Sequence, residues 1–241
     1  MIKSFVLRSG RMSRAQIRSY KNGKENFLIP YSPELTDFGR YFGNQRPVTL
    51  EIGFGMGFAT AEIASRHPEN NYLGVEVFRA GVGKLLWEIE NRNLRNIRII
   101  EHDAVEVLEN MAGPESFAAV HIFFPDPWPK KRHHKRRLVK RPFTGLLASR
   151  LRSRGYLYMV TDWPDYGDFA LAELGATEGL ENPYGGGFAP RRDWRPVTKF
   201  EKKGLDKNHP IRELYFVKST VSNPTSGPTA MKLWMYEEFK K

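Results

Sequence analysis

Short apolar runs alternate with amphipathic stretches through the middle of the chain. The runs have the length of buried strands, and the stretches between them have the apolar spacing of helices with one buried face. Such regular alternation predicts a mostly parallel sheet with helices on both faces. The predicted strands are 48–52, 72–77, 97–101, 119–124 and 156–161. The predicted helices are 57–67, 79–91, 104–111, 141–151 and 164–174.

The two ends of the chain differ from this central region. A further apolar run at 212–217 follows a stretch rich in Pro and Gly, and we expect it to pair antiparallel at the far end of the sheet. Residues 1–46 are basic and poorly periodic, which indicates an N-terminal arm. Residues 219–241 begin with Ser, Thr, Pro and Gly, which is typical of a flexible tail. The α/β domain is therefore expected to span residues 47–218.

Composition supports a folded domain without cysteine chemistry. Of the 241 residues 40% are hydrophobic and 13% aromatic, enough for a sizeable core, and no cysteine is present for disulfides or thiolate metal sites. The first residues do not resemble a signal peptide, and no apolar run approaches the roughly 20 residues of a membrane span. We expect a cytoplasmic protein with no membrane contact.

Charge is distributed unevenly along the chain. The net charge is +11, yet residues 47–126 contain 6 Lys plus Arg against 12 Asp plus Glu. Residues 1–24 hold seven basic residues and no acid, and residues 130–141 hold eight basic residues in twelve positions. A basic balance alone often serves only solubility. An acidic centre between two basic segments instead indicates a cofactor-binding core with a nucleic-acid footprint.

The clearest local motif is Glu51-Ile-Gly-Phe-Gly-Met-Gly57, which follows the first strand and opens the first helix. Glycines such as Gly53 and Gly55 let the backbone approach a ligand, although a turn of this kind also occurs without one. A dinucleotide fingerprint needs its third glycine at position 58, where Phe58 stands. An acid before G-x-G-x-G is instead typical of methyltransferases, whose cofactor S-adenosyl-L-methionine carries an ammonium and a sulfonium in place of a pyrophosphate.

Three acids follow three successive predicted strands. Glu51 suits the cofactor's ammonium group, Glu76 can accept both hydroxyls of a ribose, and Asp103 can bind an adenine amino group. Each alone is more often a helix cap or a solvated loop residue. Because ligands of open α/β sheets bind at the carboxyl ends of strands, three acids there favour a cofactor site.

The fourth predicted strand leads into Phe123-Phe-Pro-Asp126-Pro-Trp128-Pro-Lys130. The prolines fix the loop and hold Asp126 at the rim where a methyl group would point. Trp128 can stack on a base, although a packed loop aromatic is the commoner reading. A dense basic run follows, which is either a solvated face or a phosphate clamp. We interpret it as an RNA-binding run made of Arg132, His133, His134, Lys135, Arg136 and Arg137.

The histidines of this run have no acid or cysteine beside them, so no metal site is expected. Two more motifs follow: Thr161-Asp162-Trp163 after the fifth strand, and Thr198-Lys-Phe-Glu201 at the start of a predicted helix. The second motif also has the Thr-x-x-Glu spacing of a capping box.

Taken together, these motifs resemble those of the bacterial tRNA (guanine-N7-)-methyltransferase family, in order, from about Phe5 to Lys218. The resemblance includes Arg8-Ser-Gly-Arg-Met and implies a class I S-adenosyl-L-methionine-dependent methyltransferase (Rossmann-like) fold of seven strands, the last antiparallel. It implies methyl transfer to N7 of a guanine in the tRNA variable loop. The sequence is compatible with a monomer or a homodimer. The implied cofactor contacts are Glu51, Gly53, Gly55, Glu76, Asp103 and Asp126. The implied contacts to the substrate guanosine are Lys130, Asp162, Thr198, Lys199, Phe200 and Glu201.

Guanine N7 is already a lone-pair nucleophile, so the reaction needs orientation and charge stabilisation rather than a base. Asp126 is the expected catalytic residue, because it can bind the guanine's donor edge near the developing positive charge. One alternative is another class I methyltransferase, acting on protein, an exocyclic amine or other RNA. Exocyclic-amine enzymes favour an Asp/Asn-Pro-Pro-aromatic loop, and Asp126-Pro-Trp lacks the second proline. The other alternative is a non-catalytic RNA-binding protein, which would not need four acids.

Overall fold

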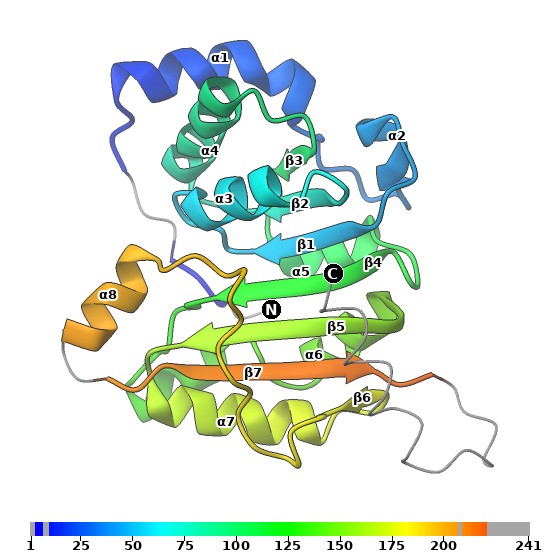
Figure 1. Cartoon of the computed structure of the whole chain (residues 1–241), viewed down its shortest axis with the longest axis vertical. Coiled ribbons are helices and arrows are strands. Elements are labelled where there is room, and N and C mark those ends of the chain that lie inside the picture. The colour runs from blue at the N-terminus through cyan, green and yellow to red at the C-terminus, as the bar shows by residue number, and fades with distance from the viewer. Residues whose placement is uncertain (1–2, 7–9, 207–208, 221–241) are drawn as a thin grey trace.

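The computed structural model describes residues 3–6, 10–206 and 209–220, apart from the side chains of Phe200 and Lys203. Seven strands form one sheet in the order β3-β2-β1-β4-β5-β7-β6 (Figure 1). Strands β1 to β5 are parallel, β7 is antiparallel to β5, and β6 is antiparallel to β7. The predicted sheet is thus confirmed, and the two-residue strand β6 is an addition to it. The strands are β1 (Val48–Ile52), β2 (Asn71–Val75), β3 (Ile97–Ile100), β4 (Phe117–Phe123), β5 (Leu151–Thr161), β6 (Leu180–Glu181) and β7 (Arg212–Lys218).

Helices cover both faces of the sheet, because alternate residues of each strand point into two separate apolar cores. One core joins residues such as Leu50 and Val120 to helices α2, α5, α6 and α7, and the other joins Phe123 and Tyr158 to α3 and α4. The helices are α1 (Arg14–Phe27), α2 (Phe38–Phe42), α3 (Phe58–Arg66), α4 (Arg79–Arg92), α5 (Ala104–Asn110), α6 (Phe143–Arg150), α7 (Pro164–Gly175) and α8 (Lys199–Asp206), with the 3-10 helix η1 (Lys131–Arg136).

Helix α1 lies within the N-terminal segment for which the sequence predicts no regular element. It packs on α4 at the outer side of the second core (Figure 1). Its buried residues include the polar Gln16 and Ser19, so no apolar stripe reveals it in the sequence. Its start does carry a signal: Ser13 and Gln16 form a capping box, in which each side chain hydrogen-bonds the other residue's backbone N–H.

Among the described residues, no helix of the second core covers strands β5 and β7. A segment of residues 182–198 crosses these strands instead and leads to α8 (Figure 1). Trp194 of this segment stacks on the buried His121 of β4, with ring centroids 5.2 Å apart. Burial lowers the pKa of His121 to about 3, so the imidazole is a neutral part of the core.

The described part of the chain was searched for membrane-spanning helices and for metal-binding clusters. None of the helices in that part has the length and apolar character needed to cross a membrane. Within the same residues no cluster of three metal-binding side chains occurs. The predicted tail at 219–241 lies outside the described residues except for its first two positions.

Candidate active site

The carboxyl ends of the parallel strands meet along one edge of the sheet, on the left of Figure 1. Strand order reverses between β1 and β4, since β2 lies on one side of β1 and β4 on the other. Ligands of open α/β sheets bind at such a reversal, just beyond the strand ends. Almost all the residues selected from the sequence follow one of these strands or lie in α8.

The glycine loop between β1 and α3 has the conformation expected from its sequence. Gly53, Gly55 and Gly57 have φ angles of 72°, 59° and 71°, a left-handed region that favours glycine. A Cβ added to Gly81 at the start of α4 would lie 1.9 Å from the Gly55 carbonyl oxygen. The loop is therefore packed directly against α4, while side chains built at Gly53 or Gly55 would meet no atom within 4 Å. This leaves open space along the outer side of the loop.

Glu76 joins the two loops that border this space. Its Oε2 accepts the backbone N–H of Gly55 at 2.8 Å, and its Oε1 accepts those of Val77 and Phe78 at 2.7 and 3.0 Å. Burial nevertheless raises the pKa of Glu76. A carboxylate offers roughly four acceptor positions, so about one is left for a ligand. Glu76 is thus an organiser of the site as well as a candidate ribose acceptor.

Glu51 is the most buried acid at this edge, with 2% of its surface exposed. It lies in β1 beside Gly74 of β2 and His121 of β4. Burial raises the pKa of Glu51 to about 7, and the Glu76 carboxylate adds to the shift. A carboxyl group in this state would gain from a cationic partner, because a nearby positive charge stabilises its ionised form.

Asp103 caps a helix. It is the N-cap of α5, and its Oδ1 accepts the backbone N–H of Val105 at 3.0 Å. The cap holds the carboxylate at the end of β3, next to the end of β2. The geometry is compatible with an additional ligand contact.

The proline-rich loop after β4 holds Asp126 in an exposed position. Phe124 and Trp128, on either side of it, have positive φ angles of 52° and 47°. Left-handed conformations are costly for bulky residues and cluster at functional sites. The alternating prolines restrict the remaining backbone freedom. Asp126 is therefore presented to solvent by a stiff, strained loop, and its role in the reaction stays a prediction.

The Trp128 side chain makes contacts within the protein. Its indole Nε1 donates to the Ser4 carbonyl oxygen at 2.9 Å, and the Arg136 guanidinium lies 4.2 Å from a Trp128 ring centroid. Arg136 also donates to the Phe5 carbonyl oxygen at 3.0 Å. The N-terminal segment 3–6 thus lies against the substrate loop, a contact that the sequence gives no means to foresee.

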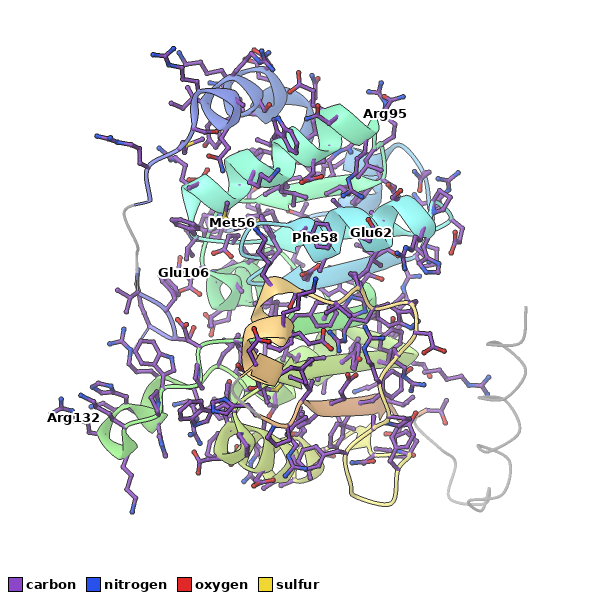
Figure 2. The ribbon with its side chains drawn as sticks, turned by 60° about the vertical axis from the view of Figure 1, so that its left-hand side comes forward. Met56, Phe58, Glu62, Arg95, Glu106 and Arg132 are labelled. Carbon is purple, nitrogen blue, oxygen red and sulfur yellow. The ribbon has the colours of Figure 1, made fainter. Side chains whose placement is uncertain are left out.

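The basic run forms η1, and its members differ in exposure. Lys130, Arg132 and Lys135 are exposed, and Arg132 projects from the lower left of Figure 2. His133 and His134 are half-buried. Contact of these residues with RNA stays a prediction.

The prediction that Arg137 contacts RNA is wrong, because its side chain is buried. Only 1% of its surface is exposed, and it donates to Asp165 and to the Pro127 carbonyl oxygen. Its guanidinium lies about 5 Å from the ring centroids of Tyr166 and Phe169. Arg137 thus fastens the proline-rich loop to α7 instead of facing RNA.

The fold brings Asp162 and the Thr198 motif together. A Cβ added to Gly204 in α8 would lie 2.8 Å from the Asp162 Cβ, so the helix backbone touches this residue directly. Thr198 caps α8, since its Oγ1 accepts the Glu201 backbone N–H at 3.1 Å. Lys199 is exposed, and the Phe200 side chain lies outside the described residues.

Glu201 departs from the capping-box expectation. Its side chain is buried and turns toward Arg195, which donates to its two oxygens at 2.6 and 3.0 Å. Arg195 also donates to Glu213 of β7 at 2.8 Å and to the Tyr158 hydroxyl of β5 at 3.2 Å. Tyr158 in turn donates to Glu213. This buried network, which we call the Arg195 hub, fastens α8 to the sheet. Its sequence signal was a single arginine three residues before Thr198.

Comparison with known proteins gives one family match and many close relatives. A family model described as "Putative methyltransferase" matches residues 45–214. A tRNA (guanine-N(7)-)-methyltransferase of Burkholderia lata is 52% identical over 90% of this chain and 85% of its own length. A tRNA (guanine-N(7)-)-methyltransferase of Bordetella pertussis is 51% identical over 89% of this chain and 84% of its own.

Solved structures show the same architecture at low sequence identity. The 16S rRNA methyltransferase KamB is 14% identical with a TM-score of 0.53, covering 78% of this chain and 95% of its own. The antibiotic-resistance methyltransferase Kmr is 16% identical with a TM-score of 0.52, covering 80% and 96%. At this identity the likeness concerns the fold alone, and it confirms the class I methyltransferase sheet.

Proposed function

Because this chain belongs to the tRNA (guanine-N(7)-)-methyltransferase family, we propose that it transfers a methyl group from S-adenosyl-L-methionine to N7 of a guanine in tRNA. The observation that supports this proposal is that the carboxyl edge brings two buried acids next to an exposed basic rim. The buried acids are Glu51 and Glu76, and the rim contains Asp126 and η1. The buried acids suit a cationic cofactor, and the basic rim suits an anionic substrate such as tRNA.

The residues at the ends of β1 and β2 fit the cofactor. The space beside Gly53 and Gly55 admits a ligand against the backbone, and the buried Glu51 carboxyl calls for a cationic partner. Glu51 would hold the ammonium group, Glu76 would accept a ribose hydroxyl, and Asp103 would lie near the adenine. When bound, the cofactor supplies an electrophilic methyl group on a positively charged sulfur. The protein's own residues orient it and exclude water.

The substrate side needs no proton abstraction before attack, since guanine N7 carries a free lone pair. The base does become positively charged as the methyl group arrives. Asp126, held by its strained loop, would accept hydrogen bonds from the guanine's donor edge and stabilise that charge. Asp162 and the Thr198 motif, joined through Gly204, would hold the guanosine from the other side. Lys130 would contact its phosphate, and His133 and His134 would border it.

The test is incubation of unmodified tRNA with methyl-labelled cofactor, followed by digestion and nucleoside analysis. We expect the label in 7-methylguanosine. Label only in N1-, N2- or ribose-methylated products would overturn the assignment, and binding of tRNA without transfer would favour the non-catalytic alternative.

Asp126→Asn keeps the loop and removes the charge. We expect kcat to fall by roughly 100- to 1,000-fold, the range for a lost charge-stabilising group. The melting temperature should stay nearly unchanged because Asp126 is exposed. Asp168→Asn, at an exposed position on α7, is the matched control. A near-normal kcat for Asp126→Asn would remove this residue from the reaction.

A further inference from the structure

Helix α1 has two faces of different chemistry. One face packs on α4, where Gln16 Nε2 donates to the Ala80 carbonyl oxygen at 3.2 Å. The opposite face carries Arg14, Arg18 and Lys21, all exposed, at positions i, i+4 and i+7. Residues so spaced lie in one row along a helix. We call these three residues the α1 stripe.

The stripe differs from the other basic surfaces of the cofactor half. On α3 and α4 the arginines are neutralised by neighbours: Arg66 and Arg92 each lie 2.7 Å from a Glu62 oxygen, and Arg79 lies 2.7 Å from Glu101. Within the described residues, no carboxylate lies within ion-pair distance of any member of the α1 stripe. The exposed Glu25 follows Lys21 by four residues in the same row, but among the described residues it forms no ion pair with the stripe. The α1 stripe therefore presents unneutralised charge.

The stripe is held in a fixed position relative to the active-site edge. The Tyr20 hydroxyl of α1 donates to Glu101 Oε2 at 2.6 Å, directly after β3, and Arg79 donates to the other Glu101 oxygen. Figure 1 places α1 at one end of the molecule, above α4 and β3. In Figure 2 Arg132 of η1 lies toward the opposite end. The active-site edge thus lies between two cationic surfaces.

We propose that the α1 stripe binds the sugar–phosphate backbone of a double-stranded arm of the substrate tRNA, away from the guanine that is modified. This proposal rests on the proposed function, because it takes tRNA as the substrate. The stripe is about 10 Å long, at 1.5 Å rise per residue. A row of three cations over this length can contact roughly two to three phosphates of one duplex strand. A membrane surface fits less well, since the opposite face of α1 is already packed on α4.

The experiment compares three proteins with equal folding but different charge placement. The stripe variant is Arg14→Gln/Arg18→Gln/Lys21→Gln. The control variant, Arg40→Gln/Arg95→Gln/Arg152→Gln, removes the same charge from exposed positions in α2 and at the amino ends of β3 and β5, opposite the active site. Affinity for unmodified tRNA is measured at several salt concentrations. Glutamine is a good helix former, so the melting temperature of the stripe variant should not change.

We expect the log–log salt dependence to become shallower by about 2–3 in the stripe variant, at roughly 0.7–0.9 per lost phosphate contact. The control variant should keep the native slope. KM for tRNA should rise at least 10-fold in the stripe variant, with kcat at saturating tRNA unchanged. An RNA hairpin that contains only the modified loop should bind the native protein and the stripe variant equally.

Coincident slopes for the stripe and control variants would overturn the proposal, because the effect would then reflect net charge alone. A defect that persists on the hairpin would also overturn it, since the stripe would then contact the modified loop itself. Failure of the proposed function is a separate outcome. In that case the native protein forms no 7-methylguanosine, while the slopes still report whether the stripe binds RNA.

Discussion

The carboxyl edge of the sheet has two halves that are built in opposite ways. At the ends of β1 and β2, Glu51 and Glu76 are buried, and Glu76 accepts three backbone N–H groups. After β4, Asp126 and the η1 cations Arg132 and Lys135 are exposed. The difference follows from the ligands that each half is proposed to bind. A small cofactor of fixed shape can be met by buried groups held in place before binding, whereas a large polyanion is met by exposed side chains acting through charge.

The substrate half has one exception to this division, the Arg195 hub. Arg195 lies in it with less than 2% of its surface exposed, between two carboxylates and a tyrosine hydroxyl. Its two carboxylate partners hold its pKa above the ordinary value despite burial. The exposed Lys199 of α8, which is proposed to contact the guanosine, therefore lies on a helix that is held by a buried ionic network.

The largest effect is expected from removing Arg195, the centre of the hub. Arg195→Met leaves Glu201 and Glu213 buried without their partner, so the free energy of unfolding should fall by about 3–5 kcal/mol in urea titrations. Arg195→Lys should recover only part of it, because an ammonium cannot bind a carboxylate through two parallel hydrogen bonds. An unchanged free energy of unfolding in Arg195→Met would show that the hub does not hold α8.

A milder change separates positioning from stability. Tyr158→Phe removes one hydroxyl of the hub, at a cost of roughly 1 kcal/mol, and should leave the protein folded. If the hub positions α8, KM for tRNA rises in this variant while cofactor affinity is retained. Equal changes in both quantities would mean that the two halves are not independent.

The next effect concerns the cofactor half and depends on pH. The folded-state pKa of Glu51 is about 7 against an ordinary value of 4.5, so the folded protein keeps a proton that the unfolded chain has lost. Stability is therefore fully present below pH 4.5 and is lost as pH rises toward 7, by about 3 kcal/mol in all. Glu51→Gln cannot titrate. Relative to native protein it should gain about that amount between pH 4 and pH 8, in urea titrations without cofactor.

Cofactor binding gives the same residue a second readout. Glu51→Gln should bind S-adenosyl-L-methionine more weakly at pH 8, because the ammonium group loses its carboxylate. Glu109→Gln, which replaces an exposed acid of α5, is a suitable control. A stability difference between native protein and Glu51→Gln that does not vary with pH would contradict the burial argument.

The smallest effect is expected from removing the exposed cations of η1. Arg132→Gln/Lys135→Gln should make the salt dependence of tRNA binding shallower by about 1–2, with cofactor affinity unchanged. Arg136 and Arg137 are left out because both are bound within the protein. The control Arg40→Gln/Arg95→Gln removes equal charge elsewhere. Parallel salt slopes for native protein and the η1 variant would show that η1 does not contact phosphate.

Sequence alone predicted the sheet because its signal is local and repeated. Buried parallel strands appear as apolar runs, and glycines with positive φ mark the turn after β1. Helix α1 was not predicted because its buried face uses Gln16 and Ser19, although Ser13 and Gln16 spell its capping box. The helix depends on tertiary contact with α4, which periodicity does not report.

The sequence predicted where the candidate residues lie in the fold better than it predicted the contacts they make. Residues after successive strands must share one edge, so the position of the acids followed from topology. Which arginine of a basic run is buried depends on what packs above it. Arg137 meets Asp165 of α7, and Glu201 meets Arg195 rather than its own helix start. Such partners are separated along the chain by loops, and the path of a loop cannot be predicted from its local sequence.

The contact between the N-terminal segment and the substrate loop bears on how the protein should be produced. Backbone oxygens of Ser4 and Phe5 accept hydrogen bonds from Trp128 and Arg136, so these two residues lie against the rim proposed to receive the guanine. A bulky affinity tag joined a few residues before this contact would crowd an incoming tRNA. Activity assays on material with an uncleaved N-terminal tag would therefore understate turnover. A preparation with a free amino terminus is the better reference for all kinetic work.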